Sequence, residues 1–187
     1  MVLRNTFTYA EAQRAGVSDR HLRKQLLDAT VVRLGRGVYT RNMPLGEEEL
    51  VEIAVRAPDA TLCLLTALSR HALSDQIPTR IDVALPRHRR PPKLTAAVAW
   101  HRFDVSTYEI GRITMDLCDD IHIGIYNPER CIVDAFRLRH QEGEEVAIEA
   151  LRRWLRRPAS TPARLLEMAS HFPKAEPSLR HALRVLL

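Results

Sequence analysis

The sequence predicts an α+β protein in two parts, and three observations support this prediction. The first 45 residues contain two short amphipathic helix patterns followed by two strand-like runs around a glycine turn. Residues 46–187 alternate between longer helix patterns and short apolar runs bounded by turn residues. A break at Met43-Pro44-Leu45-Gly46 separates the two patterns. We therefore expect domains at residues 1–45 and 46–187, the second with a small mixed or antiparallel sheet and packed helices.

The basic charge of the chain is concentrated in the first of these domains. The 187 residues include 28 Lys and Arg and 23 Asp and Glu, of which eight basic and three acidic residues lie in the first 45. The rest of the chain therefore has twenty of each and is neutral overall. A basic field confined to one segment is typical of a module that binds a polyanion, although a solvated basic face gives the same pattern.

Residues 8–29 contain the signals of two short helices joined by a tight turn. Thr8 and Glu11 have the spacing of a capping box, and Gly16 is placed to end the first helix in a left-handed conformation. Ser18 is a good N-cap for the second helix. One face of that second helix is apolar, with Leu22, Leu26 and Ala29. The opposite side is basic, with Arg20, His21, Arg23 and Lys24.

A strand-like hairpin follows directly, with Gly35-Arg36-Gly37 as a turn whose glycines permit positive φ. Two helices followed by such a hairpin predict a winged helix-turn-helix that binds DNA, with protein contacts through the same fold as the alternative. In this fold the second helix reaches base edges and the wing touches phosphates. We expect base contacts from Ser18, Arg20, His21 and Lys24. We expect phosphate contacts from Arg23, Arg33 and Arg36.

The second domain combines helices and strands. Periodicity and caps predict helices at residues 47–57, 62–73, 127–136, 145–156, 161–170 and 177–187. Apolar runs predict strands at residues 80–86, 97–103, 108–115 and 121–125. Between the first two strands lies a proline-bearing basic loop with Arg87, Arg89 and Arg90. This loop is open to three interpretations: a contact to DNA phosphate, a contact to an acidic protein surface, or a solvated loop.

The sequence contains none of the motifs that carry common catalytic chemistry. A phosphate-binding glycine loop, a zinc-protease helix and a serine-hydrolase elbow are all absent. Asp116, Asp119 and Asp120 are interpreted as solvated turn residues rather than a metal site. Neither the three cysteines nor His101, His122 and His140 have metal-ligand spacing. We therefore predict a protein that is not an enzyme and needs no metal or cofactor. The odd number of widely spaced cysteines, with no signal peptide or 18-residue apolar run, predicts a cytoplasmic location.

Five segments in order along nearly the whole chain resemble the AbiEi-type antitoxins, the regulatory half of type IV toxin–antitoxin systems. These are residues 31–39, 62–68, 75–78, 82–86 and 127–137, which read VVRLGRGVY, LCLLTAL, DQIP, DVALP and NPERCIVDAFR. The resemblance implies a transcriptional repressor that binds repeats in its own promoter through the winged helix. It also implies an antitoxin domain at residues 46–187. The implied partner is a nucleotidyltransferase-like toxin, which the protein would counter directly or indirectly.

The resemblance also makes three residues of one predicted helix candidates for a partner or DNA contact. Arg130, Asp134 and Arg137 lie on one face at positions i, i+4 and i+7. The alternative is an intrahelical ion network worth a few tenths of a kcal/mol per pair. A repeated operator would match a homodimer on DNA, because the symmetry of protein and site usually agree.

Two other functions remain open at this point. The chain could be an enzyme that neutralises the toxin by covalent modification, although no catalytic motif supports this reading. It could also be a plain transcription factor with a ligand-sensing second domain. The neighbouring gene distinguishes this last reading from an autoregulating antitoxin, which requires an adjacent nucleotidyltransferase-like gene.

Overall fold

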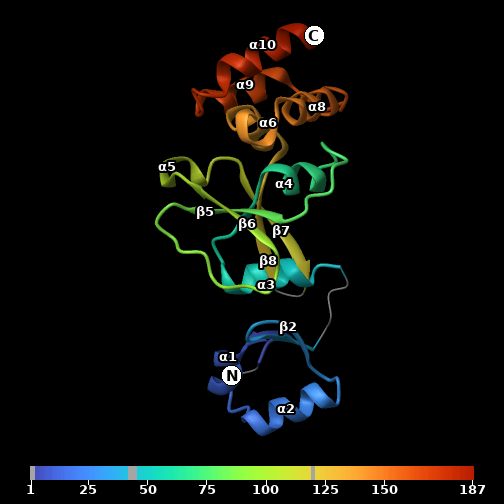
Figure 1. The fold of residues 1–187 in the computed structure, drawn as a ribbon, viewed down its shortest axis with the longest axis vertical. Coiled ribbons are helices and arrows are strands. Elements are labelled where there is room, and N and C mark those ends of the chain that lie inside the picture. The colour runs from blue at the N-terminus through green and yellow to red at the C-terminus, as the bar shows by residue number, and fades with distance from the viewer. Residues whose placement is uncertain (1–2, 42–45, 119–120) are drawn as a thin grey trace.

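The computed structural model describes residues 3–41, 46–118 and 121–187, and it confirms the predicted α+β class (Figure 1). The described residues form ten helices, a three-stranded antiparallel sheet near the N-terminus and a five-stranded mixed sheet. Buried apolar residues form two separate clusters, one around each sheet. We call residues 3–41 the N-terminal unit and the rest the larger unit. The predicted domain boundary falls at residues 42–45, outside the described residues.

The N-terminal unit is built by local signals that the sequence already contains. Its elements are β1 (Thr6–Thr8), α1 (Tyr9–Arg14), α2 (Asp19–Leu27), β2 (Val32–Gly35) and β3 (Val38–Thr40). The capping box of Thr8 and Glu11 is confirmed, and Gly16 has φ +80° at the end of the first helix. Strand β3 lies between β1 and β2 and is antiparallel to both. A small core of Phe7, Ala12, Leu22, Val31 and Tyr39 joins the sheet to the two helices.

The sheet of the larger unit is mixed because its chain order differs from its spatial order. Its strands are β4 (Thr61–Leu62), β5 (Ile81–Pro86), β6 (Val98–Phe103), β7 (Arg112–Cys118) and β8 (Ile121–Tyr126). Their order across the sheet is β6-β5-β4-β8-β7. The pairs β5–β6 and β4–β8 are parallel, whereas β4–β5 and β7–β8 are antiparallel.

Eight described helices of the larger unit pack against this sheet or against one another. They are α3 (Glu48–Arg56), α4 (Leu64–Arg70), α5 (Val105–Tyr108), α6 (Pro128–Arg137), α7 (Arg139–Glu142), α8 (Glu144–Leu155), α9 (Pro162–Ser170) and α10 (Glu176–Leu186). Figure 1 shows α3 between the sheet and the N-terminal unit, with the C-terminal helices at the far end of the molecule. Among the described residues, no helix is long and apolar enough to cross a membrane.

Two of the predicted elements of the larger unit are wrong in part. The helix expected from residue 62 begins at Leu64, because Thr61 and Leu62 form the short central strand β4 between β5 and β8. The strand expected from residue 108 begins at Arg112, because Tyr108 ends the short helix α5 and Gly111 turns the chain at φ +74°. In both cases neighbouring elements, rather than local hydrophobicity, decide the conformation of a buried apolar run.

Candidate nucleic-acid interface

Helix α2 has one buried and one exposed side. Leu22 is buried in the N-terminal core, and Leu26 packs against that core. The predicted contact residues Arg20, His21, Arg23 and Lys24 are all exposed on the rest of the helix. Ser18 is exposed too, and its side-chain oxygen accepts a hydrogen bond from the backbone N–H of His21 at 3.2 Å. This oxygen therefore caps the helix, and a base contact by Ser18 would have to share it.

Tyr9 joins three parts of the N-terminal unit at one place. Its backbone N–H donates to the carbonyl oxygen of Gly37 in the hairpin turn at 2.9 Å. Its hydroxyl donates to Oδ1 of Asp19, in the first turn of α2, at 2.7 Å. The same oxygen accepts from Nε2 of Gln13 at 2.7 Å. The hydrogen bond to Asp19 raises the pKa of Tyr9 and keeps its hydroxyl in the donating form. The hairpin turn is thereby held beside the start of α2.

The hairpin presents the two remaining predicted phosphate contacts. Arg33 and Arg36 are both exposed, and Nε of Arg33 donates to the carbonyl oxygen of Gly35 at 3.0 Å. Gly37 has the expected positive φ of +72°, but Gly35 does not share it. Gly35 instead lies against the end of the Glu52 side chain in α3, which a Cβ atom at residue 35 would displace.

The cations of this surface are not neutralised by neighbouring acids. Within the described residues, no carboxylate forms an ion pair with Arg20, Arg23, Lys24, Arg33 or Arg36. The nearby carboxylate of Asp19 is already bonded to Tyr9 and Gln13. Five unpaired cations on one helix and its adjacent hairpin produce a local positive potential that attracts a polyanion.

The arginines of the basic loop in the larger unit differ in whether a neighbouring acid neutralises their charge. Arg89 pairs with Asp59, which follows α3, so its charge is partly neutralised. The side chains of Arg87 and Arg90 are exposed and form no ion pair with a described residue. The backbone carbonyl of Arg87 accepts a hydrogen bond from the guanidinium of Arg102, which fixes the start of the loop. Arg87 and Arg90 are therefore the residues of this loop whose charges are free for an acidic or nucleic-acid partner.

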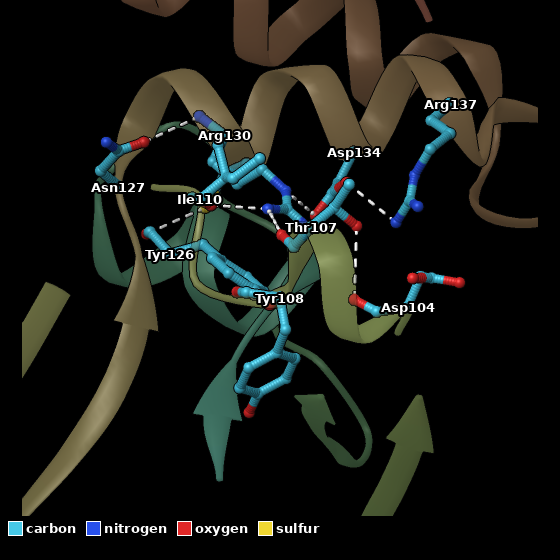
Figure 2. Close-up of polar contacts among 10 residues, drawn as sticks. Asp104, Thr107, Tyr108, Ile110, Tyr126, Asn127, Arg130, Asp134 and Arg137 are labelled. Atoms are coloured by element: carbon cyan, nitrogen blue, oxygen red, sulfur yellow. Dashed lines mark hydrogen bonds and ion pairs between the residues drawn. The ribbon is translucent and has the colours of Figure 1, made fainter. Parts of the chain in front are cut away.

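Two of the three predicted contact residues of α6, Arg130 and Asp134, lie in the core instead of on the surface (Figure 2). Arg130 and Asp134 have no exposed area, and the side chain of Arg137 is 20% exposed. Neither Arg130 nor Asp134 can contact DNA or a partner in this structure, so that expectation is corrected. The intrahelical ion network is present, with Nε of Arg130 and Nη2 of Arg137 each 2.9 Å from a carboxylate oxygen of Asp134.

This buried cluster holds the segment between α5 and β7 and two aromatic rings in place. Nη1 of Arg130 donates to the carbonyl oxygens of Thr107 at 2.8 Å and Ile110 at 2.6 Å. Its guanidinium lies 4.2 Å from the ring centroids of both Tyr126 and Phe172. Burial raises the pKa of the Asp134 carboxyl, and the flanking guanidinium groups oppose that shift. The cluster is therefore structural: it fixes α6 on the turn between α5 and β7.

Among the described residues, the remaining Asp and His candidates include two separate pairs. Asp116 is solvated as expected, with a side chain that is 85% exposed, but it lies in strand β7 instead of a turn and pairs with Nδ1 of His122 at 2.7 Å. Asp119 and Asp120 lie outside the described residues. Nε2 of His101 lies 3.0 Å from Oδ1 of Asp82, and His140 is exposed. The described part of the chain has no group of three His, Cys, Asp or Glu residues placed to hold a metal ion.

One buried residue that holds the hairpin of this surface is not identified by the sequence patterns. Glu52 is 1% exposed, and its carboxylate accepts hydrogen bonds from the backbone N–H groups of Arg36, Thr95 and Ala96. The signal was present, because an acid interrupts the apolar run Leu50-Val51-Glu52-Ile53-Ala54 of α3. A charge at such a buried position requires partners, although the sequence does not identify them.

Comparison with known proteins adds no assignment: neither a model of a known protein family nor a curated protein matches this chain.

Proposed function

We propose that this chain is a DNA-binding transcriptional repressor whose residues 1–45 form a winged helix-turn-helix. The observation that carries the proposal is the exposed basic side of α2, whose cations have no described acidic partner and whose start is joined to the hairpin turn through Tyr9. A helix of this kind fits the major groove, and the hairpin then reaches the phosphate backbone beside it.

The proposed roles follow from the place of each side chain. Arg20 lies in the first turn of α2, where a guanidinium can bind the O6 and N7 atoms of guanine with two hydrogen bonds. Lys24 lies one turn later and contacts a neighbouring base edge. Arg23, Arg33 and Arg36 bind phosphates and set the position of the helix along the groove. Two copies on a repeated operator would double these contacts.

Substitution of Lys24 and Arg36 tests the DNA-binding proposal. We expect the purified protein to prefer the duplex upstream of its own gene over a scrambled duplex. Lys24→Ala should cost about 1–3 kcal/mol of binding free energy and relax the preference. Arg36→Ala should weaken binding to both duplexes and make the plot of log affinity against log salt shallower by about one. Fluorescence anisotropy across a salt series measures both effects.

The control is Lys174→Ala, a substitution of the same type at an exposed position in the larger unit, far along the chain from α2. It should leave the affinity and the salt dependence unchanged. If the wild-type protein shows no preference between the two duplexes at moderate salt, the DNA-binding proposal is wrong. The winged helix would then serve protein contacts.

We further propose that the repressor is an autoregulating antitoxin that counters a nucleotidyltransferase-like toxin. This part of the proposal is supported by the resemblance of its ordered sequence segments to the AbiEi-type antitoxins. It assigns promoter binding to the N-terminal unit and the action against the toxin to the larger unit. These two activities should be separable, since they use different parts of the chain.

Coexpression with the product of the adjacent gene tests the antitoxin proposal. We expect the wild-type protein to restore growth that the toxin arrests, and a variant with Lys24→Ala and Arg36→Ala to restore it equally well while failing to repress the promoter. Constant expression from an unrelated promoter keeps the amounts of the two proteins equal. Growth arrest that the wild-type protein does not relieve would contradict the proposal. The intact mass of the purified toxin, with and without the antitoxin, then reports any covalent modification.

A further inference from the structure

A single buried carboxylate joins the hairpin of the N-terminal unit to the larger unit. Oε1 of Glu52 accepts from the backbone N–H of Arg36 at 3.2 Å and from that of Thr95 at 3.0 Å. Oε2 accepts from the N–H groups of Thr95 and Ala96, both at 3.0 Å. The contact therefore links three segments: the hairpin turn, helix α3 and the loop before β6.

The hairpin fits this carboxylate closely. Gly35 lies against the Glu52 side chain, where an added Cβ would be 2.1 Å from both Cδ and Oε1 and 2.6 Å from Cγ. Helix α3 packs along β2 on one side and along β8 on the other. The turn thus packs directly against the Glu52 side chain, which an added Cβ would displace, and the Arg36 N–H donates to the carboxylate.

The contact requires that both oxygen atoms of the Glu52 side chain accept hydrogen bonds. All three groups that face Glu52 are backbone N–H donors, and an ionised carboxylate can accept from each of them. A glutamine at this position would turn an NH₂ group toward at least one of these donors. Removing the carboxylate also takes the shared acceptor away from these part-buried N–H groups.

We propose that Glu52 is a positioning residue for DNA binding, which fixes the hairpin turn on the larger unit so that the Arg36 side chain points at a phosphate. This inference rests on the proposed DNA-binding function. The backbone of Arg36 is held by Glu52, whereas its side chain is exposed and has no described acidic partner. The larger unit thereby adds a second contact to the hairpin turn that Tyr9 already holds beside the start of α2.

The test compares Glu52→Gln, Arg36→Ala and the double variant in the same duplex-binding measurement across salt. Glu52→Gln should make the salt dependence shallower by about one, as Arg36→Ala does, although residue 52 itself reaches no DNA. If the affinities at 1 M salt are equal, a slope difference of about 0.9 makes the variant bind roughly eightfold more weakly at 0.1 M salt. The double variant should bind no more weakly than Arg36→Ala, since both single changes remove the same phosphate contact.

Glu47→Gln is the matched control, because Glu47 lies at the start of the same helix and pairs with Arg70 away from the hairpin. It should leave the salt dependence unchanged. Thermal unfolding of each variant shows that the measurement is made on folded protein. Glu52→Asp, whose shorter side chain keeps the charge but cannot reach both sides, serves if the glutamine variant does not fold, and it should give the same shift.

The outcomes separate the two proposals. If Lys24→Ala leaves specific binding unchanged, the DNA-binding proposal itself fails. If Lys24→Ala weakens binding but the folded Glu52 variants keep the wild-type salt dependence, Glu52 has only a structural role and the positioning proposal is wrong. An additive loss in the double variant would also overturn it, because the two residues would then act on different contacts.

Discussion

Replacing Arg130 by methionine is expected to lower the free energy of unfolding by about 3–5 kcal/mol, the usual cost of breaking a fully buried ion pair. The substitution leaves the Asp134 carboxylate buried without its Arg130 partner and leaves the carbonyls of Thr107 and Ile110 without a donor. It also removes the guanidinium that lies over the rings of Tyr126 and Phe172. Urea denaturation followed by circular dichroism measures the loss.

The chain offers a matched control in Arg180→Met. Arg180 also pairs with an acid one helical turn away, Glu176 at 2.8 Å, but its side chain is 55% exposed. Exposed pairs contribute less than about 1 kcal/mol, so this change should be nearly neutral. The double variant Arg130→Met, Asp134→Leu should lose less stability than Arg130→Met alone, because the fully buried carboxylate is removed together with its partner and only the partly exposed Arg137 loses an ion pair. Equal losses at positions 130 and 180 would show that the buried network does not stabilise the fold.

Replacing Gly111 by alanine is expected to lower the free energy of unfolding by about 2–5 kcal/mol. The residue has φ +74°, a conformation that costs about 1–2 kcal/mol for residues with a Cβ atom. The new Cβ would also lie 2.7 Å from Cβ of Arg130, and forcing an extra methyl into a packed site costs about 1–3 kcal/mol. Because that neighbour is close to the backbone of α6, it cannot rotate away. The same denaturation measurement reports the effect.

Gly46→Ala separates the two contributions to this loss. Gly46 has a similar φ of +81°, but no atom lies within 4 Å of the position that a Cβ would occupy. It should therefore lose only the conformational part, about 1–2 kcal/mol. If both alanine variants were equally destabilised, the close contact between Gly111 and Arg130 would contribute nothing, and α6 would be free to shift away from the turn.

The sequence by itself determined the class of the fold and most element ends, because these depend on contacts between residues near one another in the chain. The capping box at Thr8 and Glu11 is confirmed, as is Asn127 with Pro128 at the start of α6. Gly16 and Gly37 have the expected left-handed conformation. Short side chains bond the backbone three residues away, and a missing Cβ permits positive φ, whatever the rest of the chain does.

Only the tertiary structure decided which charged residues are buried and what they hold. The spacing of Arg130 and Asp134 predicts an ion pair on one helix face, but the burial of that face depends on Tyr126, Phe103 and Phe172 from other elements. The same holds for Glu52, whose partners lie 16 to 44 residues away along the chain. Such contacts depend on how distant segments pack, and no local pattern in the sequence encodes that packing.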